Sequence, residues 1–266
     1  MNESELILTH ILSCKRADLY LGNFFLDRKK IERLNWILIK RGYHYPLAYL
    51  LGKVEFMGLN FKVKKGVFIP RFETEILIET VTDLVKDSED LKFKDLKILD
   101  IGTGCGNIAV CLAKFLSNVE IIATDISVSA LDIARENAKR NEVKDRIEFV
   151  QVDIFTYLLP TPYYLLDIII SNPPYIPTKE IKNLQKEIRF EPYISIDGGP
   201  DGLDFYRRII YEAPNYLKKK GFLILEVGFE QCKGIEEIFK LSKRYEILNT
   251  VKDYNNIDRV IVARYG

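Results

Sequence analysis

Residues 96–115 read LKILDIGTGCGNIAVCLAKF, which is an apolar run, a glycine-rich turn and an amphipathic segment in succession. The run 96–101 predicts a buried strand, and the spacing from residue 107 onward predicts a helix. Gly102, Gly104 and Gly106 allow the backbone to turn tightly and to approach a ligand without an intervening Cβ atom. A strand, a glycine loop and a helix in this order predict an open α/β sheet that binds its ligand beyond the strand ends.

Strand and helix patterns alternate over the remaining chain after residue 73. The strand-like runs are 96–101, 119–125, 146–153, 165–171, 221–228, 245–251 and 258–266, and the main helical runs are 73–87, 107–117, 129–141, 203–219 and 230–243. This alternation predicts a mostly parallel sheet covered on both faces. The last two runs lie too close for a helical crossover and should pair antiparallel. We therefore expect a Rossmann-like α/β fold with a seven-stranded, mostly parallel sheet and a C-terminal antiparallel hairpin.

The N-terminal part has a different character. Between residues 3 and 50, apolar side chains recur at intervals of three and four, which predicts a small helical module. The stretch that follows, KVEFMGLNFKVKKGVFIP, alternates aromatic or β-branched residues with polar ones around Gly58 and Gly66, as in a β-hairpin or an extended linker. We expect a helical domain over residues 1–50, a linker over 51–73 and the α/β domain over 74–266.

The bulk composition is that of a soluble globular protein, with 266 residues of which 47% are hydrophobic and 29% charged. The start of the chain lacks the basic-then-apolar plan of a leader peptide, and no apolar run approaches the roughly 20 residues that cross a bilayer. The four cysteines show no CxxC spacing, so neither a metal site nor a disulfide frame is indicated. We expect a cytoplasmic protein without a metal, in which His10 and His44 are surface or packing residues.

Charge is unevenly distributed along the chain. Residues 1–70 carry 12 Lys and Arg against 6 Asp and Glu, a balance of +6, whereas the other 196 residues carry 27 against 32, a balance of −5. A basic N-terminal end can attract nucleic acid or an acidic protein surface. A solvated helical face explains the same counts equally well.

The glycine loop by itself fits more than one nucleotide ligand. Asp125 ends the second strand, where a carboxylate can accept hydrogen bonds from both hydroxyls of a ribose. The register Gly104-x-Gly106-x-x-Ala109, with Asp125 about 20 residues further on, satisfies the dinucleotide fingerprint of a nicotinamide dehydrogenase. The glycines could also serve only the close packing of helix on strand.

One acidic residue favours a different nucleoside. Asp100 stands two residues before Gly102, in a D-x-G-x-G-x-G pattern that resembles motif I of S-adenosylmethionine-dependent methyltransferases. The resemblance implies that Asp100 lies near the methionine end of the cofactor. Asp153, after the third strand, matches the acidic position near adenine in such enzymes, although alone it could be a helix cap or turn residue.

The fourth strand ends in SNPPYIP, residues 171–177. Proline has no backbone N–H, so this turn cannot continue the sheet ladder, and it presents carbonyl groups without competing donors. A planar amide or exocyclic amine carries two N–H donors, which the side-chain oxygen of Asn172 and the carbonyl of Pro173 can accept. Pro174 stiffens the turn, and Tyr175 supplies a flat surface and a hydroxyl. The turn therefore suits methylation of a planar nitrogen.

Taken together, these motifs resemble the peptide-chain release factor glutamine methyltransferase family (HemK type). The stretches that carry the resemblance are 46–63, 68–75, 99–113, 123–127, 171–177, 191–207 and 255–263, whereas residues 1–44 match only as a generic helical module. The resemblance implies methylation of the side-chain amide of the glutamine in the Gly-Gly-Gln loop of bacterial release factors.

The resemblance also implies roles for individual residues. The substrate glutamine should lie against Asn172, Pro173, Pro174 and Tyr175. The expected contacts of S-adenosylmethionine are Asp100, Gly102, Thr103, Gly104, Cys105, Gly106, Asp125, Ile126, Asp153, Ile154 and Asn172. The helical module should contact the release factor body, and we expect a monomer that binds neither a membrane nor nucleic acid directly.

A few positions depart from the family pattern at the edge of the expected site. Phe72 stands where the family usually has proline, and Ser195-Ile196 stand where it often has Ala-Leu. We expect Arg71 and Glu73 to pair and to fix the linker against the α/β domain. The loop 197–203, DGGPDGL, could be a lid or an ordinary connector.

Rival functions share part of the chemistry. Methylation of an exocyclic amine of RNA or DNA, or of a ribosomal protein glutamine, would use the same proline turn. Acting on a duplex base requires flipping it out and a strongly basic surface, which counts against DNA. A dehydrogenase function would not explain the proline turn. A non-catalytic binding function would explain neither the glycine loop nor the proline turn.

Overall fold

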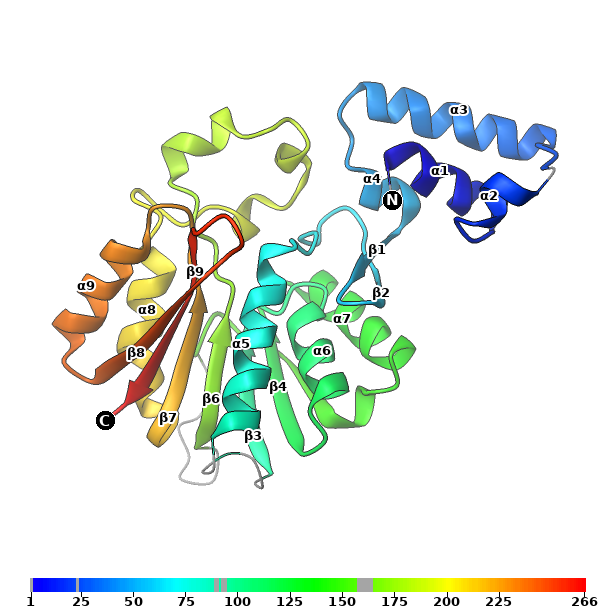
Figure 1. The fold of residues 1–266 in the computed structure, drawn as a ribbon. Helices are drawn as coiled ribbons and strands as arrows, with labels where there is room; N and C mark the ends of the chain where they lie inside the picture. The colour runs from blue at the N-terminus through cyan, green and yellow to red at the C-terminus, as the bar shows by residue number, and fades with distance from the viewer. Residues whose placement is uncertain (1, 23, 89–90, 92–94, 157–164) are drawn as a thin grey trace.

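The computed structural model describes residues 2–22, 24–88, 91, 95–156 and 165–266 (Figure 1). Its main sheet has seven strands in the order β5-β4-β3-β6-β7-β9-β8. The strands are β3 (Leu96–Ile101), β4 (Val119–Asp125), β5 (Ile147–Gln151), β6 (Leu166–Ser171), β7 (Leu217–Glu226), β8 (Tyr245–Lys252) and β9 (Asp258–Tyr265). Neighbouring strands are parallel except that β9 runs antiparallel to both β7 and β8. The predicted fold class is confirmed.

Helices cover both faces of this sheet (Figure 1). They are α5 (Glu73–Asp87), α6 (Asn107–Phe115) and α7 (Val128–Arg140) on one face, and α8 (Asp204–Glu212) and α9 (Cys232–Ser242) on the other. Successive side chains of a strand point to opposite faces, so Ile98 joins the first core and Leu99 the second, as do Ile168 and Ile169. Burial of each such side chain contributes about 1.5–3 kcal/mol relative to exposure.

The strand order places the glycine loop beside the proline turn. From β3 the chain moves outward to β4 and β5, and then returns to the other side of β3 as β6. Such a reversal leaves a crevice at the carboxyl ends of the two central strands. Ile101 pairs in register with Ser171, so Gly102 and Asn172 leave the sheet from adjacent strands. Two motifs that are 70 residues apart in sequence therefore meet at one edge.

The N-terminal helices form a module of their own above this edge (Figure 1). They are α1 (Glu3–Leu12), α2 (Asp18–Leu21), α3 (Arg28–Gly42) and α4 (Leu47–Leu51), around a small core of Ile7, Ile11, Ile37 and Leu50. A hairpin of β1 (Lys53–Phe56) and β2 (Leu59–Lys62) follows. Its two-residue turn, Met57-Gly58, has φ values of 50° and 74°, as a type I′ turn requires.

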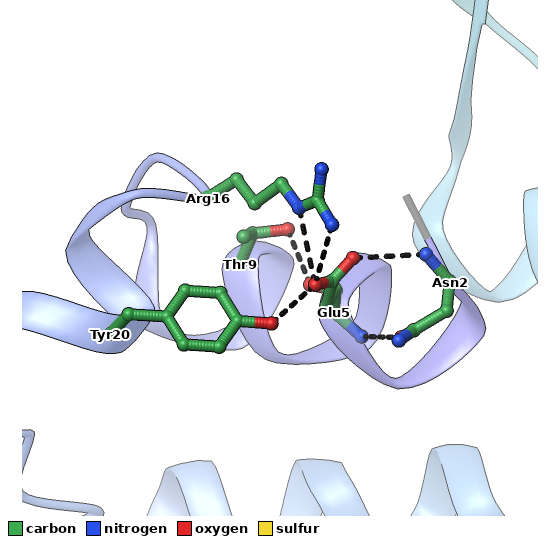
Figure 2. Close-up of polar contacts among 5 residues, drawn as sticks. All are labelled: Asn2, Glu5, Thr9, Arg16 and Tyr20. Atoms are coloured by element: carbon green, nitrogen blue, oxygen red, sulfur yellow. Dashed lines mark hydrogen bonds and ion pairs between the residues drawn. The ribbon is translucent and has the colours of Figure 1, made fainter.

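Glu5 is the polar centre of the first two helices (Figure 2). It forms a capping box with Asn2, with N···O distances of 2.9 and 3.0 Å. The same carboxylate accepts hydrogen bonds from Tyr20 at 2.5 Å and from Arg16 at 3.0 and 3.1 Å. The Tyr20 hydroxyl is the main cause that lowers the pKa of Glu5 to about 2, so the carboxylate stays charged and holds α2 against α1.

The helix predicted over 203–219 is too long. In the structure α8 ends at Glu212, a 3₁₀ turn spans Ala213–Asn215, and β7 begins at Leu217. Pro214 has no N–H for a helical hydrogen bond, and Leu217 is buried in the sheet core. Between β6 and α8 the chain forms three further 3₁₀ turns, Thr178–Asn183, Ile188–Phe190 and Tyr193–Ser195. None of the helices in the described parts of the chain combines the length and apolar character that crossing a membrane requires.

Candidate active site

A cavity of about 380 Å³ opens at the carboxyl edge of the sheet, where β3 and β6 end. Its volume lies within the range of small-molecule sites, about 300–1,000 Å³. Most of the predicted site residues line it: Gly102, Thr103, Gly104, Asp125, Ile126, Asp153, Ile154, Asn172, Pro173, Pro174 and Tyr175. The fold therefore brings most of the predicted cofactor residues and all four predicted substrate residues to one cavity.

Three predicted cofactor residues lie behind the cavity wall. Asp100 is fully buried and accepts a hydrogen bond of 2.6 Å from the Thr103 hydroxyl. Cys105 is buried as well, and a Cβ atom on Gly106 would lie 3.0 Å from the Cβ of Ala134. These residues hold the loop against the strand and α7, and their direct contact with a ligand stays a prediction.

The front of the glycine loop has room for a ligand. Gly102 and Gly104 have φ values of 72° and 58°, and added Cβ atoms would meet nothing within 4 Å. The Asp125 carboxylate accepts hydrogen bonds from the backbone N–H groups of Gly104 at 2.9 Å and Ser127 at 2.8 Å. Burial raises the pKa of Asp125 while these N–H groups oppose the rise. Each oxygen keeps a second lone pair that can accept from a hydroxyl group.

The proline turn is fixed from two sides. The Asn172 side-chain amide donates from Nδ2 to the hydroxyl of Thr74, a buried residue of α5, at 3.0 Å. Gln231 donates to the carbonyl of Tyr175 at 2.8 Å. The first bond leaves Oδ1 as the acceptor that Asn172 can offer a ligand. Burial raises the pKa of Tyr175 to about 12, so its phenol keeps its proton at neutral pH.

Asp153 is already engaged by a basic side chain of the cavity wall. Arg208 of α8 donates to its two oxygens at 3.1 and 3.2 Å, and both side chains are more than a third exposed. An adenine contact by Asp153 therefore has to coexist with this ion pair. The sequence patterns did not single out Arg208, because its partner is 55 residues away.

The expected pair of Arg71 with Glu73 is wrong. Arg71 forms its ion pair with Glu191, whose carboxylate also accepts from the backbone N–H of Ile69 at 3.1 Å. Glu73 lies at the start of α5 and reaches Arg259 at 3.9 Å. The linker still contacts the α/β domain, but its partner is the turn that ends at Glu191.

The departures from the family pattern lie at the rim. Phe72 is 77% exposed, whereas Ser195 and Ile196 line the cavity. The loop 197–203 is tied down by the hydrogen bond from Gly198 to the carbonyl of Ile176 at 2.9 Å. This hydrogen bond supports the interpretation of the loop as an ordinary connector and not as a lid.

Comparison with known proteins agrees with this geometry. Residues 1–52 match the family described as PrmC N-terminal domain, and residues 92–261 match the one described as Methyltransferase domain. A release factor glutamine methyltransferase of Geobacter sulfurreducens is 36% identical over 267 residues, which cover 99% of this chain and 89% of the relative. The relative of the same name from Dictyoglomus turgidum is 39% identical, with 97% and 89% covered.

The chain belongs to the release factor glutamine methyltransferase family. Solved structures with this fold include the hMettl16 catalytic domain in complex with MAT2A 3′UTR hairpin 1, at a TM-score of 0.64 and 16% identity, covering 90% of this chain and 81% of that one. The ribosomal protein L11 methylase of Lactobacillus delbrueckii subsp. bulgaricus has a TM-score of 0.53 and 18% identity, with 77% and 84% covered. At such identities the likeness shows the fold alone, so the release factor glutamine methyltransferase assignment rests on the sequence relatives.

Proposed function

We propose that this chain transfers a methyl group from S-adenosylmethionine to the side-chain amide nitrogen of the glutamine in the Gly-Gly-Gln loop of bacterial release factors. Membership of the family supports the activity and the substrate. The observation that carries the chemistry is the orientation of Asn172, whose amide nitrogen is bound to Thr74 and whose oxygen is left for the cavity.

The residues at the glycine loop fit the cofactor. S-adenosylmethionine, when bound, supplies a methyl group on a positively charged sulfur. Gly102 and Gly104 leave space for a close approach, and Asp125 offers two oxygens with free lone pairs to ribose hydroxyls. Ile126 and Ile154 provide apolar contact surface at the same wall.

The proline turn would hold the glutamine amide in place. Asn172 Oδ1 and the Pro173 carbonyl accept the two N–H groups, and Tyr175 supports the amide plane. A glutamine amide is a weak nucleophile because its lone pair is delocalised, so correct placement matters more than a general base. Orientation of this kind can supply about 7–11 kcal/mol. The nitrogen would gain the methyl group as the bond between that methyl group and the sulfur breaks, which leaves S-adenosylhomocysteine, and it would afterwards lose one of its protons to water.

The helical module would recognise the body of the release factor. Together with most of the linker it carries a balance of +6 over residues 1–70, which suits an acidic protein surface. We infer the same division of the chain as the sequence suggests, with recognition over residues 1–50, a linker over 51–73 and methyl transfer over 74–266. We further infer a cytoplasmic monomer that binds no nucleic acid directly.

Mass spectrometry of a purified release factor, incubated with the enzyme and S-adenosylmethionine, tests this function. We expect a gain of one methyl group on the Gly-Gly-Gln peptide, and a loss of at least 100-fold in rate for Asn172→Ala, because misplacement of the nitrogen costs on that order. Methylation of RNA or of a ribosomal protein instead would keep the chemistry and reject the substrate. If no methyl group is transferred to any of these molecules and NADH binds tightly, both the proposed chemistry and the proposed substrate are rejected.

A further inference from the structure

Three polar side chains from three different parts of the fold lead from the proline turn into the core. Asn172 follows β6, Thr74 lies in the first turn of α5, and Glu226 ends β7. Thr74 is 1% exposed and Glu226 is 2% exposed. Asn172 donates to the Thr74 hydroxyl at 3.0 Å, and burial raises the pKa of Glu226 while the nearby Thr74 hydroxyl opposes the rise. Among the described residues, the second oxygen of Glu226 has no hydrogen-bond partner.

The direction of these hydrogen bonds follows from the number of protons. A threonine hydroxyl has one proton to donate and lone pairs to accept. Since Thr74 accepts from Asn172 Nδ2, its own proton is free to point at Glu226. A carboxyl oxygen accepts that proton whether or not the carboxyl group is itself ionised.

This direction decides which end of the Asn172 amide faces the cavity. With Nδ2 bound to Thr74, Oδ1 is presented to an incoming N–H donor. If the Asn172 amide turned by 180°, its NH₂ group would face the donors of the substrate amide, and no hydrogen bond could form. Burial makes the choice costly to reverse, because an unsatisfied buried donor costs about 1–3 kcal/mol.

We propose that Thr74 and Glu226 are positioning residues, which act through each other to hold the Asn172 amide with its oxygen toward the substrate nitrogen. The inference rests on the proposed function, since it names what aligns the acceptor for that nitrogen. Thr74 lines the cavity together with Asn172, whereas Glu226 is not among the lining residues. Thr74 supplies the acceptor for Nδ2, and Glu226 keeps the Thr74 proton away from Asn172.

A matched pair of variants at position 74 tests the first step. Thr74→Val removes the hydroxyl at nearly constant shape, whereas Thr74→Ser keeps it. We expect Thr74→Val to lower kcat for release factor methylation by roughly 10- to 100-fold, with little change in the affinity for S-adenosylmethionine. Thr74→Ser should keep kcat within a few-fold of the original. Equal kcat for Thr74→Val and the original enzyme would overturn the proposal.

A second pair of variants, at position 226, tests whether Glu226 acts on Asn172 through Thr74, and it leaves α5 unaltered. We call this indirect action the relay. Glu226→Leu removes the acceptor, so the Thr74 proton can turn to Asn172 Oδ1, and we expect a loss of kcat similar to that of Thr74→Val. Glu226→Gln keeps an acceptor oxygen and should restore most of the activity. If Thr74→Val does not fold, this pair decides, and equal activity of the Leu and Gln variants would contradict the relay.

One readout requires no turnover and separates this inference from the proposed function. Exchange of the Asn172 side-chain NH₂ protons with solvent can be measured by NMR. It should be slow for the proton that is hydrogen-bonded to the Thr74 hydroxyl, and faster in Thr74→Val. Fast exchange in both proteins would overturn the inference, even if the original enzyme methylates release factors. Slow exchange only with Thr74 present would support it, even if the original enzyme methylates another substrate.

Discussion

At the scale of single residues, Asp100 shows how burial changes an acidic side chain. It is fully buried beneath the glycine loop, its Oδ1 has no hydrogen-bond partner among the described residues, and burial raises its pKa from 3.8 to about 7. The folded protein therefore keeps a proton that the unfolded chain releases near pH 4. The stability from this group is complete below pH 4 and is lost as the pH rises to about 7.

We predict that Asp100→Asn makes stability less dependent on pH. Each pH unit between about 4 and 7 should lower the unfolding free energy of the original protein by up to about 1.4 kcal/mol through this one group. The asparagine cannot titrate, so its contribution to the slope disappears. Urea unfolding at pH 5 and pH 7 measures the difference, with the exposed Asp132→Asn as control. An unchanged slope in Asp100→Asn would contradict the raised pKa.

Most of the residues that the sequence predicts for the site line the cavity, but the sequence did not predict their partners. Asp125 and Asn172 come at the ends of apolar runs, and a polar residue in that place can be recognised from the sequence. Thr74 has no such signal, because a threonine in an amphipathic helix looks like a surface residue until α5 is placed against β6. Glu191 was missed for the same reason, since it reaches Arg71 across 120 residues.

At the scale of elements, most strands were predictable because they contain a short apolar or alternating run bounded by turn residues. The helix end at Glu212 was missed because residues up to 219 continue a helical spacing, whereas Pro214 and the buried Leu217 start a new element. The 3₁₀ turns between Thr178 and Ser195 have no periodicity that a sequence pattern can detect. Ile188, Ile194 and Ser195 of these turns line the cavity.

The hairpin turn at Met57-Gly58 gives a prediction for one element. Gly58 has a φ of 74°, so Gly58→Ala should lower the unfolding free energy by about 1–2 kcal/mol. Gly42, in α3, has no neighbour within 4 Å of an added Cβ and no left-handed φ, so Gly42→Ala should raise it by about 0.5–1 kcal/mol. Thermal or urea unfolding of the two variants measures both changes. Equal effects of the two substitutions would contradict the turn geometry.

At the scale of the whole molecule, one short segment joins the helical module to the cavity. Residues 187–191 receive an ion pair from Arg41 to Glu187 at 2.9 Å and an edge-to-face contact from Tyr45 to Phe190 at 5.0 Å. Ile188, within the same segment, lines the cavity. The sequence predicted the two parts in their order, but the contact between them depends on side chains that no periodic pattern marks.

We predict that Tyr45 and Phe190 are energetically coupled. An edge-to-face aromatic pair contributes about 0.5–1.5 kcal/mol beyond its buried area. In a double-mutant cycle of Tyr45→Ala and Phe190→Ala, the two losses of unfolding free energy should therefore differ from additivity by that amount. The same cycle with Tyr45→Ala and Phe115→Ala, an exposed residue of α6, serves as the control. Additive losses in the first cycle would mean that the ring contact does not hold the two parts together.

The shared segment also limits how the molecule can change over evolutionary time. Since residues 187–191 contact the helical module on one side and contribute to the cavity wall on the other, a change in the packing of the helical module on this segment would disturb the cavity. A different helical module would have to supply partners for Glu187 and Phe190 to keep these contacts. We therefore expect the two parts to have been inherited as one unit.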